Sequence, residues 1–114
     1  MESQYRDTLV AILAGYLNQK AIKYLQDYHY DKMTYTDNSN KEFRQADELS
    51  SVYSGVESAS LALSKEIIEE AEANGLDINK DEGEIAELLT KTLKDETIIQ
   101  RLYDKADNLV NELP

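Results

Sequence analysis

The sequence has few of the residues that break helices or cross-link a fold. Its 114 residues include no cysteine, four glycines, one histidine and one proline, which is the last residue. Without cysteine the chain has no disulfide framework, no cysteine-ligated zinc finger and no thiol nucleophile. A β-sandwich or barrel needs turn residues about every 8–12 positions, which this composition does not supply. The single histidine leaves little basis for a Ser-His-Asp triad or a histidine-based metal site.

Long hydrophobic runs are also missing. The longest, residues 9–17, has nine residues including Gly15, whereas a membrane-spanning helix needs about 20. A secretory signal would begin with a basic region, but Glu2, Arg6 and Asp7 sum to a charge of −1. We therefore expect a cytoplasmic protein that does not bind membranes, and the lack of cysteine is consistent with a reducing compartment.

Basic residues are scarce relative to acidic ones. Twelve Lys and Arg stand against 23 Asp and Glu, a formal net charge of −11. Nucleic-acid binding depends on bases that neutralise phosphates, so we expect no DNA or RNA partner. Nine carboxylates accompany one base, Lys80, in residues 66–87: Glu66, Glu69, Glu70, Glu72, Asp77, Asp81, Glu82, Glu84 and Glu87. They form either a solvated surface or a binding surface for a basic protein.

Apolar residues recur with the period of amphipathic helices. The first predicted helix spans residues 3 to about 33 and begins with Ser3 as N-cap. Its apolar stripe is Tyr5, Leu9, Ile12, Leu13, Tyr16, Leu17, Ala21, Tyr24, Leu25 and Tyr28. A second helix of about 33 residues follows the capping box of Ser39 and Glu42. It ends at Asn74-Gly75, because glycine readily takes the left-handed position after a helix.

A third helical segment follows a capping box at Asp81 and Glu84. Its apolar stripe is interrupted at residues 94–96. We favour one helix bent near 94–97, and the alternative is two helices with Asp95 as N-cap. The fold prediction is one all-α domain over residues 1–114, an elongated antiparallel bundle of three long helices, or of four if the third is broken.

Small residues recur every four positions on the second helix. Ser51, Gly55 and Ala59 would allow a neighbouring backbone to approach closely, and a glycine inside a helix costs about 1 kcal/mol relative to alanine. We favour the first helix as the neighbour. The alternative is another protein or a second copy of the chain in a homodimer.

The end of the first helix is rich in aromatic residues. Tyr28, Tyr30, Met33 and Tyr35 lie beside His29. Tyrosine and methionine are favoured at protein interfaces, which makes this segment a candidate partner-binding surface. The alternative is that the rings pack inside and only the hydroxyl groups reach water.

The linker before the third segment resembles the calcium-binding loop of EF-hand proteins. Asp77, Asn79 and Asp81 occupy its first, third and fifth positions and are candidate metal ligands. The glycine falls at the seventh position instead of the sixth, and Leu88 stands where a bidentate glutamate belongs.

Two further resemblances concern other families. Glu66, Glu69 and Glu70 resemble the glutamate-rich motifs of all-α nucleotide pyrophosphatases, which implies Mg²⁺ and hydrolysis of a nucleotide. Tyr53-Ser54-Gly55 together with Tyr103-x-x-x-Asp107 resembles the turn and export tail of small type VII secreted helical proteins.

The function predicted from these features is non-enzymatic. We expect a small acidic protein-binding module without cofactor, of the inhibitor, immunity, anti-defence or assembly-adaptor type. Its partner would be a protein with a basic surface. The alternatives are a carboxylate-based metal protein or pyrophosphatase-like enzyme, and a type VII-like secreted protein.

Overall fold

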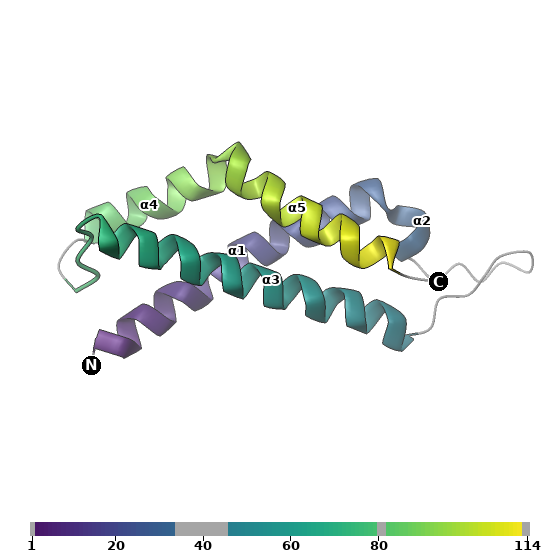
Figure 1. Ribbon diagram of the computed structural model, residues 1–114, viewed down its shortest axis with the longest axis horizontal. Helices are drawn as coiled ribbons and strands as arrows, with labels where there is room; N and C mark the ends of the chain where they lie inside the picture. The colour runs from purple at the N-terminus through teal and green to yellow at the C-terminus, as the bar shows by residue number, and fades with distance from the viewer. Residues whose placement is uncertain (1, 34–45, 80–81, 113–114) are drawn as a thin grey trace, which may run out of the picture.

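The protein is an elongated bundle of helices, seen here in a computed structural model that describes residues 2–33, 46–79 and 82–112. In chain order the helices are α1 (Glu2–Tyr28), α2 (Tyr30–Met33), α3 (Ala46–Ala73), α4 (Glu82–Lys94) and α5 (Glu96–Asn111). Helix α3 runs antiparallel to α1 and to the α4–α5 pair (Figure 1). The described residues contain no strand, and the molecule measures 58 × 27 × 18 Å. The all-α antiparallel prediction is therefore confirmed.

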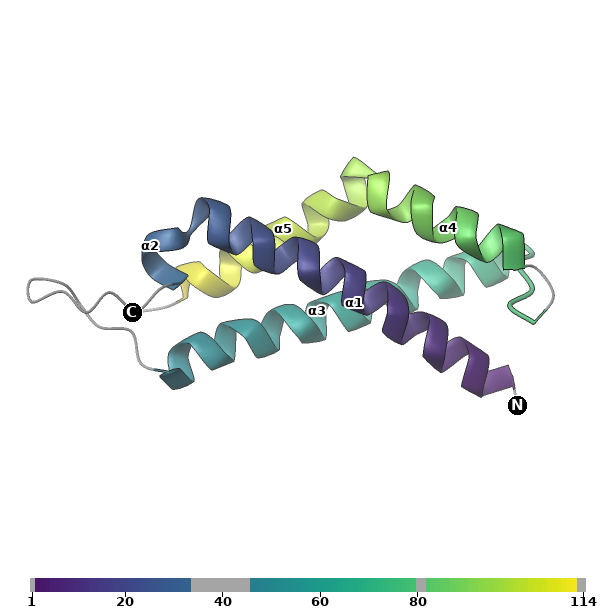
Figure 2. The ribbon, with the colours of Figure 1, turned by 180° about the vertical axis from the view of Figure 1, so that it is seen from behind.

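Helices α1 and α3 cross at an oblique angle (Figures 1 and 2). Both helices carry a row of buried residues that recurs every four positions. The rows are Leu9, Leu13, Leu17, Ala21 and Leu25 on α1, and Val52, Val56, Ser60, Ser64 and Ile68 on α3, and Val10, Leu49, Leu63 and Ile67 are buried beside them. Ridges of this spacing interdigitate at about −50°, whereas a coiled-coil seam crosses at about +20°. Helices that cross in this way diverge toward their ends.

The wide apolar stripe predicted for α1 is only partly buried, and here the prediction is wrong. Tyr5, Ile12 and Tyr16 are 63%, 46% and 48% exposed, and Tyr28 is 73% exposed. The residues four apart from Leu9 to Leu25 take the side that faces the bundle. Ile12 and Tyr16 lie about a quarter-turn away from that row. Tyr5, four residues before Leu9, continues the row toward the start of α1, where it is exposed.

The end of α3 is the glycine-terminated helix end that the sequence predicts. Gly75 has φ of +102°. The Leu76 N–H donates to the Ala71 carbonyl at 3.0 Å, and the Gly75 N–H donates to the Glu72 carbonyl at 3.1 Å. These two bonds are the Schellman arrangement that satisfies the last carbonyls of a helix.

The third segment is two helices, so the favoured continuous helix is wrong and its alternative is confirmed. Asp95 has an extended backbone, and its Oδ1 accepts from the N–H groups of Thr97 at 3.0 Å and Ile98 at 3.4 Å. The first helix likewise ends earlier than predicted, because the chain bends at His29 before the single turn α2. Helix α1 begins at Glu2, which places Ser3 inside it.

The predicted capping boxes at Ser39 and Asp81 lie outside the described residues. Among the helices that are described, none is long and apolar enough to cross a membrane.

Candidate functional site

A groove runs between the C-terminal part of α3 and α4. It consists of two cavities of about 370 and 270 Å³, which share Ala71, Asn74, Leu88 and Lys91 among their lining residues. The second cavity continues to Thr92, Asp95 and Ile98 at the α4–α5 joint, so both belong to one continuous depression. We call it the α3–α4 groove, and its apolar floor is formed by Ile67, Ala71, Leu76, Leu88 and Ile98.

The groove stays open because α4 is the least buried of the long helices. Thr92 is its only fully buried residue. The apolar residues Ile85, Leu88, Leu89 and Leu93 are half-buried at the edge of the core. A helix normally buries such a stripe completely against its neighbours. Helix α4 therefore presents apolar surface that this chain covers only in part.

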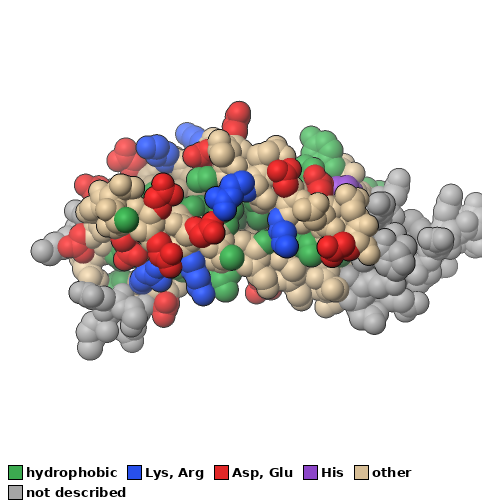
Figure 3. Space-filling model, in the orientation of Figure 1, with side chains coloured by type: hydrophobic (Ala, Val, Ile, Leu, Met, Phe, Trp, Pro, Cys, Tyr) green, Lys and Arg blue, Asp and Glu red, His purple; other side chains and the backbone are tan. Residues whose placement is uncertain are grey.

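Carboxylates surround the α3–α4 groove. Glu70 contributes from α3, Glu84 and Glu87 from α4, and Asp95 from the joint, whereas Lys91 is the single base among the lining residues. No ion pair or hydrogen bond engages the side chains of Glu70, Glu84 or Glu87 within the described residues, and all three are exposed. Figure 3 shows acidic side chains, with several basic ones among them, over the part of the molecule where α3 ends and α4 begins. Four acids around one base make the groove electronegative.

The acidic surface predicted from the sequence divides into two groups. Glu66 accepts a hydrogen bond from Arg101 at 2.7 Å. Arg6 on α1 donates to Glu69 at 3.2 Å and Glu72 at 3.0 Å, and these bonds, above all the one to Glu72, raise the pKa of the guanidinium. These three glutamates tie α3 to α1 and α5. Of the other six, Glu70, Glu84 and Glu87 line the groove and Glu82 is exposed at the start of α4.

The predicted metal ligands do not form a cluster that the structure describes. Asp77 is half-buried, and its Oδ1 accepts from the backbone N–H of Asn79 at 3.0 Å, a local turn bond. Asp81 lies outside the described residues. Across residues 2–33, 46–79 and 82–112 no three His, Asp or Glu side chains are grouped as metal ligands.

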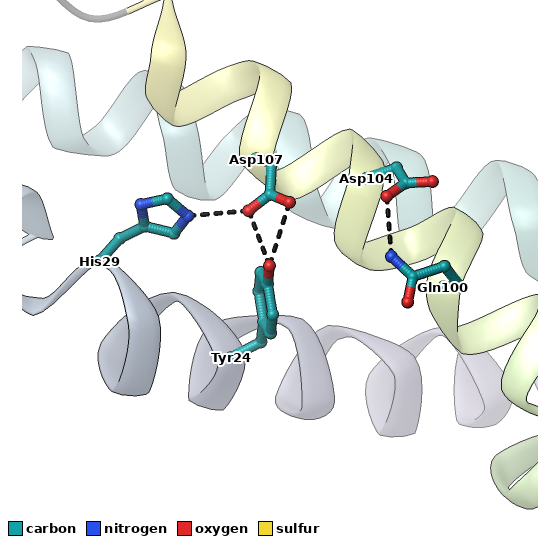
Figure 4. A network of polar contacts seen from close by, with 5 residues as sticks. All are labelled: Tyr24, His29, Gln100, Asp104 and Asp107. Atoms are coloured by element: carbon teal, nitrogen blue, oxygen red, sulfur yellow. Dashed lines mark hydrogen bonds and ion pairs between the residues drawn. The ribbon is translucent and has the colours of Figure 1, made fainter.

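A second polar centre joins α1 to α5 (Figure 4). The Tyr24 hydroxyl donates to both carboxylate oxygens of Asp107, at 2.9 and 3.0 Å, and the His29 Nε2 lies 2.8 Å from Asp107 Oδ1. The Tyr24 ring stacks on Tyr103 with centroids 4.1 Å apart. Partial burial, together with the bonds to Asp107, raises the pKa of Tyr24 to about 12. The sequence analysis missed this cluster, because 78 residues separate His29 from Asp107.

The predicted aromatic surface is smaller than expected. Tyr28 and Tyr30 are exposed, but Met33 is 5% exposed and belongs to the core. Met33 is therefore wrong as a surface residue, since its side chain packs among the apolar residues of the bundle. Tyr35 lies outside the described residues.

Two of the three small residues of α3, Gly55 and Ala59, lie next to residues of α5, and the favoured assignment of their neighbour to the first helix is wrong. A Cβ on Gly55 would lie 2.7 Å from Leu109 Cδ2. Ala59 lines a cavity of about 230 Å³ with Leu102 and other residues of α3 and α5, whereas Ser51 is exposed. The buried row of α3 that includes Ser60 and Ser64 is a different face of the helix.

Comparisons of this chain with protein-family models, with curated proteins and with solved structures find no match.

Proposed function

We propose that this chain is a non-enzymatic protein-binding module that holds a basic amphipathic helix of another protein in the α3–α4 groove. The observation that carries the proposal is the pairing of an uncovered apolar floor with an acidic rim on the same depression. An amphipathic helix that docks in a groove inserts apolar residues at i, i+3 or i+4, and i+7. Lysine or arginine on its flanks would then meet Glu70, Glu84 and Glu87.

The apolar contacts would supply most of the affinity. Burial of apolar surface is worth about 25 cal/mol per Å². An exposed ion pair contributes only about 0.2–1 kcal/mol. The carboxylates would mainly speed encounter and select basic partners over acidic ones. We place the protein with inhibitors and assembly adaptors of the cytoplasm. Its partner would be neither a nucleic acid nor a membrane, because nucleic acids and anionic membrane surfaces are negatively charged like the groove.

A designed peptide tests the proposal directly. The probe is a helical peptide with leucine at every third or fourth position and lysine elsewhere, and its control is a scrambled peptide of identical composition. We expect amide chemical shifts to change along the end of α3 and along α4 when the ordered probe is added. Equal binding of the scrambled peptide, or changes centred elsewhere, would contradict the groove as the binding site.

Matched variants separate the groove from the overall charge. Glu84→Gln with Glu87→Gln removes two rim carboxylates, and we expect probe affinity to fall about tenfold, on the order of 1.4 kcal/mol. Glu57→Gln with Glu96→Gln removes two exposed carboxylates that do not line the groove. This control pair should leave the affinity nearly unchanged. If both double variants lost the same amount of probe affinity, the effect would come from net charge alone and a specific site would be refuted.

A further inference from the structure

Large apolar side chains are exposed along the first half of α1, where Asp7 and Thr8 are exposed as well. Tyr5, Ile12 and Tyr16 are three of the six large hydrophobic residues that are exposed in the described chain, and all three are on this helix. Ala11 and Gly15 are exposed between them. We call these five residues the neutral α1 face. Single exposed apolar residues need no explanation, but several adjacent ones on one face mark an interaction surface.

Charge singles out this face from the rest of the molecule. Helix α1 contains three acids (Glu2, Asp7, Asp27) and three bases (Arg6, Lys20, Lys23), so its formal charge is 3 − 3 = 0. The whole net charge of −11 therefore belongs to residues outside α1. Residues 8–19 contain no charged side chain at all.

The same face has a shape that suits packing against another helix. Apart from the backbone of α1 itself, no atom of the described residues lies within 4 Å of the position of a Cβ added to Gly15, so no contact among them requires a glycine there. An exposed glycine inside a helix costs about 1 kcal/mol relative to alanine. Ala11 and Gly15 are four residues apart and form a shallow gap beside the projecting side chains of Ile12 and Tyr16. The face thus carries both projections and a gap.

We propose that the neutral α1 face binds a second copy of this chain, with α1 packed on α1 of the partner about a twofold axis. A symmetric interface must be complementary to itself, and in a chain of charge −11 a face without charged side chains meets its own copy without acid facing acid. The projecting Ile12 and Tyr16 of one copy would enter the gap at Ala11 and Gly15 of the other. Residues 5–19 extend over only about 22 Å, so the dimer would be weak, with Kd on the order of 10–100 µM.

Sedimentation equilibrium tests the proposal on the full chain at about 10 to 500 µM, which brackets that Kd. We expect a reversible monomer–dimer equilibrium. Ile12→Glu should raise the dimer Kd at least tenfold, with an unchanged thermal melt because the site is exposed. Tyr5→Glu is a second variant of the same face, for use if Ile12→Glu does not fold.

Leu61→Glu is the matched control, because Leu61 is 40% exposed on α3 and the change adds the same negative charge. It should leave the dimer Kd within about twofold. A wild-type chain that stays monomeric at all these concentrations, or equal effects of both glutamates, would overturn the proposal.

Salt distinguishes this inference from the proposed function. Dimerisation through a neutral face should persist or strengthen as salt rises from about 50 to about 500 mM, because salt screens the repulsion between the copies. Binding of the basic peptide to the α3–α4 groove should weaken over the same range. A dimer that dissociates with rising salt would contradict the neutral α1 face as its interface.

Discussion

Two buried serines on α3 provide an internal comparison of what a hydrogen bond is worth in this core. Ser60 and Ser64 are both 0% exposed and lie one turn apart. The Ser64 hydroxyl donates to the Ser60 carbonyl at 2.8 Å. Within the residues that the structure describes, the Ser60 Oγ has no hydrogen-bond partner. The same substitution at the two sites therefore removes an unpaired hydroxyl in one case and a paired one in the other.

The expected changes in stability follow from these environments. A buried polar group without a partner costs about 1–3 kcal/mol, and a formed hydrogen bond contributes about 1 kcal/mol. Alanine is favoured over serine in a helix by roughly 0.5 kcal/mol. Ser60→Ala should thus raise the free energy of unfolding by about 1.5 kcal/mol. For Ser64→Ala the gain in propensity and the loss of the bond oppose each other, so the net change should stay within about 0.5 kcal/mol.

Urea denaturation followed by circular dichroism measures both variants. With a slope near 1.5 kcal/mol/M, typical of a chain of this size, Ser60→Ala should move the midpoint upward by about 1 M. Both slopes should stay at the wild-type value, which would show that the unfolded state is unchanged. A Ser60→Ala midpoint at or below that of Ser64→Ala would refute the assignment of Ser60 as an unpaired group.

Three further predictions concern helix ends and helix contacts. Asp95→Ala removes the N-cap of α5 and should lower the free energy of unfolding by about 1 kcal/mol in urea. Gly55→Leu should destabilise by about 2–3 kcal/mol through overpacking, and Leu109→Ala should reverse part of that loss in a double-mutant cycle. The raised pKa of Tyr24 favours its neutral form in the folded state, so its stabilisation is complete below about pH 10 and is lost as the pH rises toward 12. Two pKa units correspond to about 2.7 kcal/mol, but Tyr24 is partly exposed, so we expect an effect of about 1 kcal/mol. It is measured as the decrease, with rising pH, of the difference in free energy of unfolding between wild type and Tyr24→Phe. A constant difference between pH 9 and 12 would contradict it.

Local chemistry explains why the end of α3 was predictable and why Asp95 was a candidate N-cap. At the end of α3 the N–H of Gly75 donates to the carbonyl three residues back and the N–H of Leu76 donates to the carbonyl five residues back. At the start of α5 the Asp95 side chain accepts from backbone N–H groups of the first turn. Such bonds involve neighbours in sequence and leave a signature there. The sequence did not decide between a bent helix and a break at Asp95. The apolar stripe is interrupted at residues 94–96 in either case, and only the structure shows that α4 and α5 are separate helices.

The residues that sequence analysis misplaced are those whose environment depends on the crossing of helices. Periodicity placed Ile12 and Leu13 in one stripe, but the crossing geometry buries Leu13 and leaves Ile12 exposed. Likewise, Gly55 needed a close neighbour, and only the packed structure identifies it as Leu109. The α3–α4 groove unites Glu70 with Glu84 across a linker, so no spacing rule reveals it.

The two candidate interaction surfaces lie on different sides of the crossed helices α1 and α3. Rows of buried residues four apart on both helices favour a steep crossing angle, and near the end of α3 the side chain of Arg6 still joins α1 to Glu69 and Glu72. The groove lies between the end of α3 and α4, whose apolar residues are only half-buried, and none of its lining residues belongs to α1. The α4–α5 pair packs on one side of the crossed helices, so the opposite side of α1 is left without a neighbour (Figures 1 and 2). Because the α3–α4 groove and the neutral α1 face share no residue, a substitution in one should leave binding at the other unchanged.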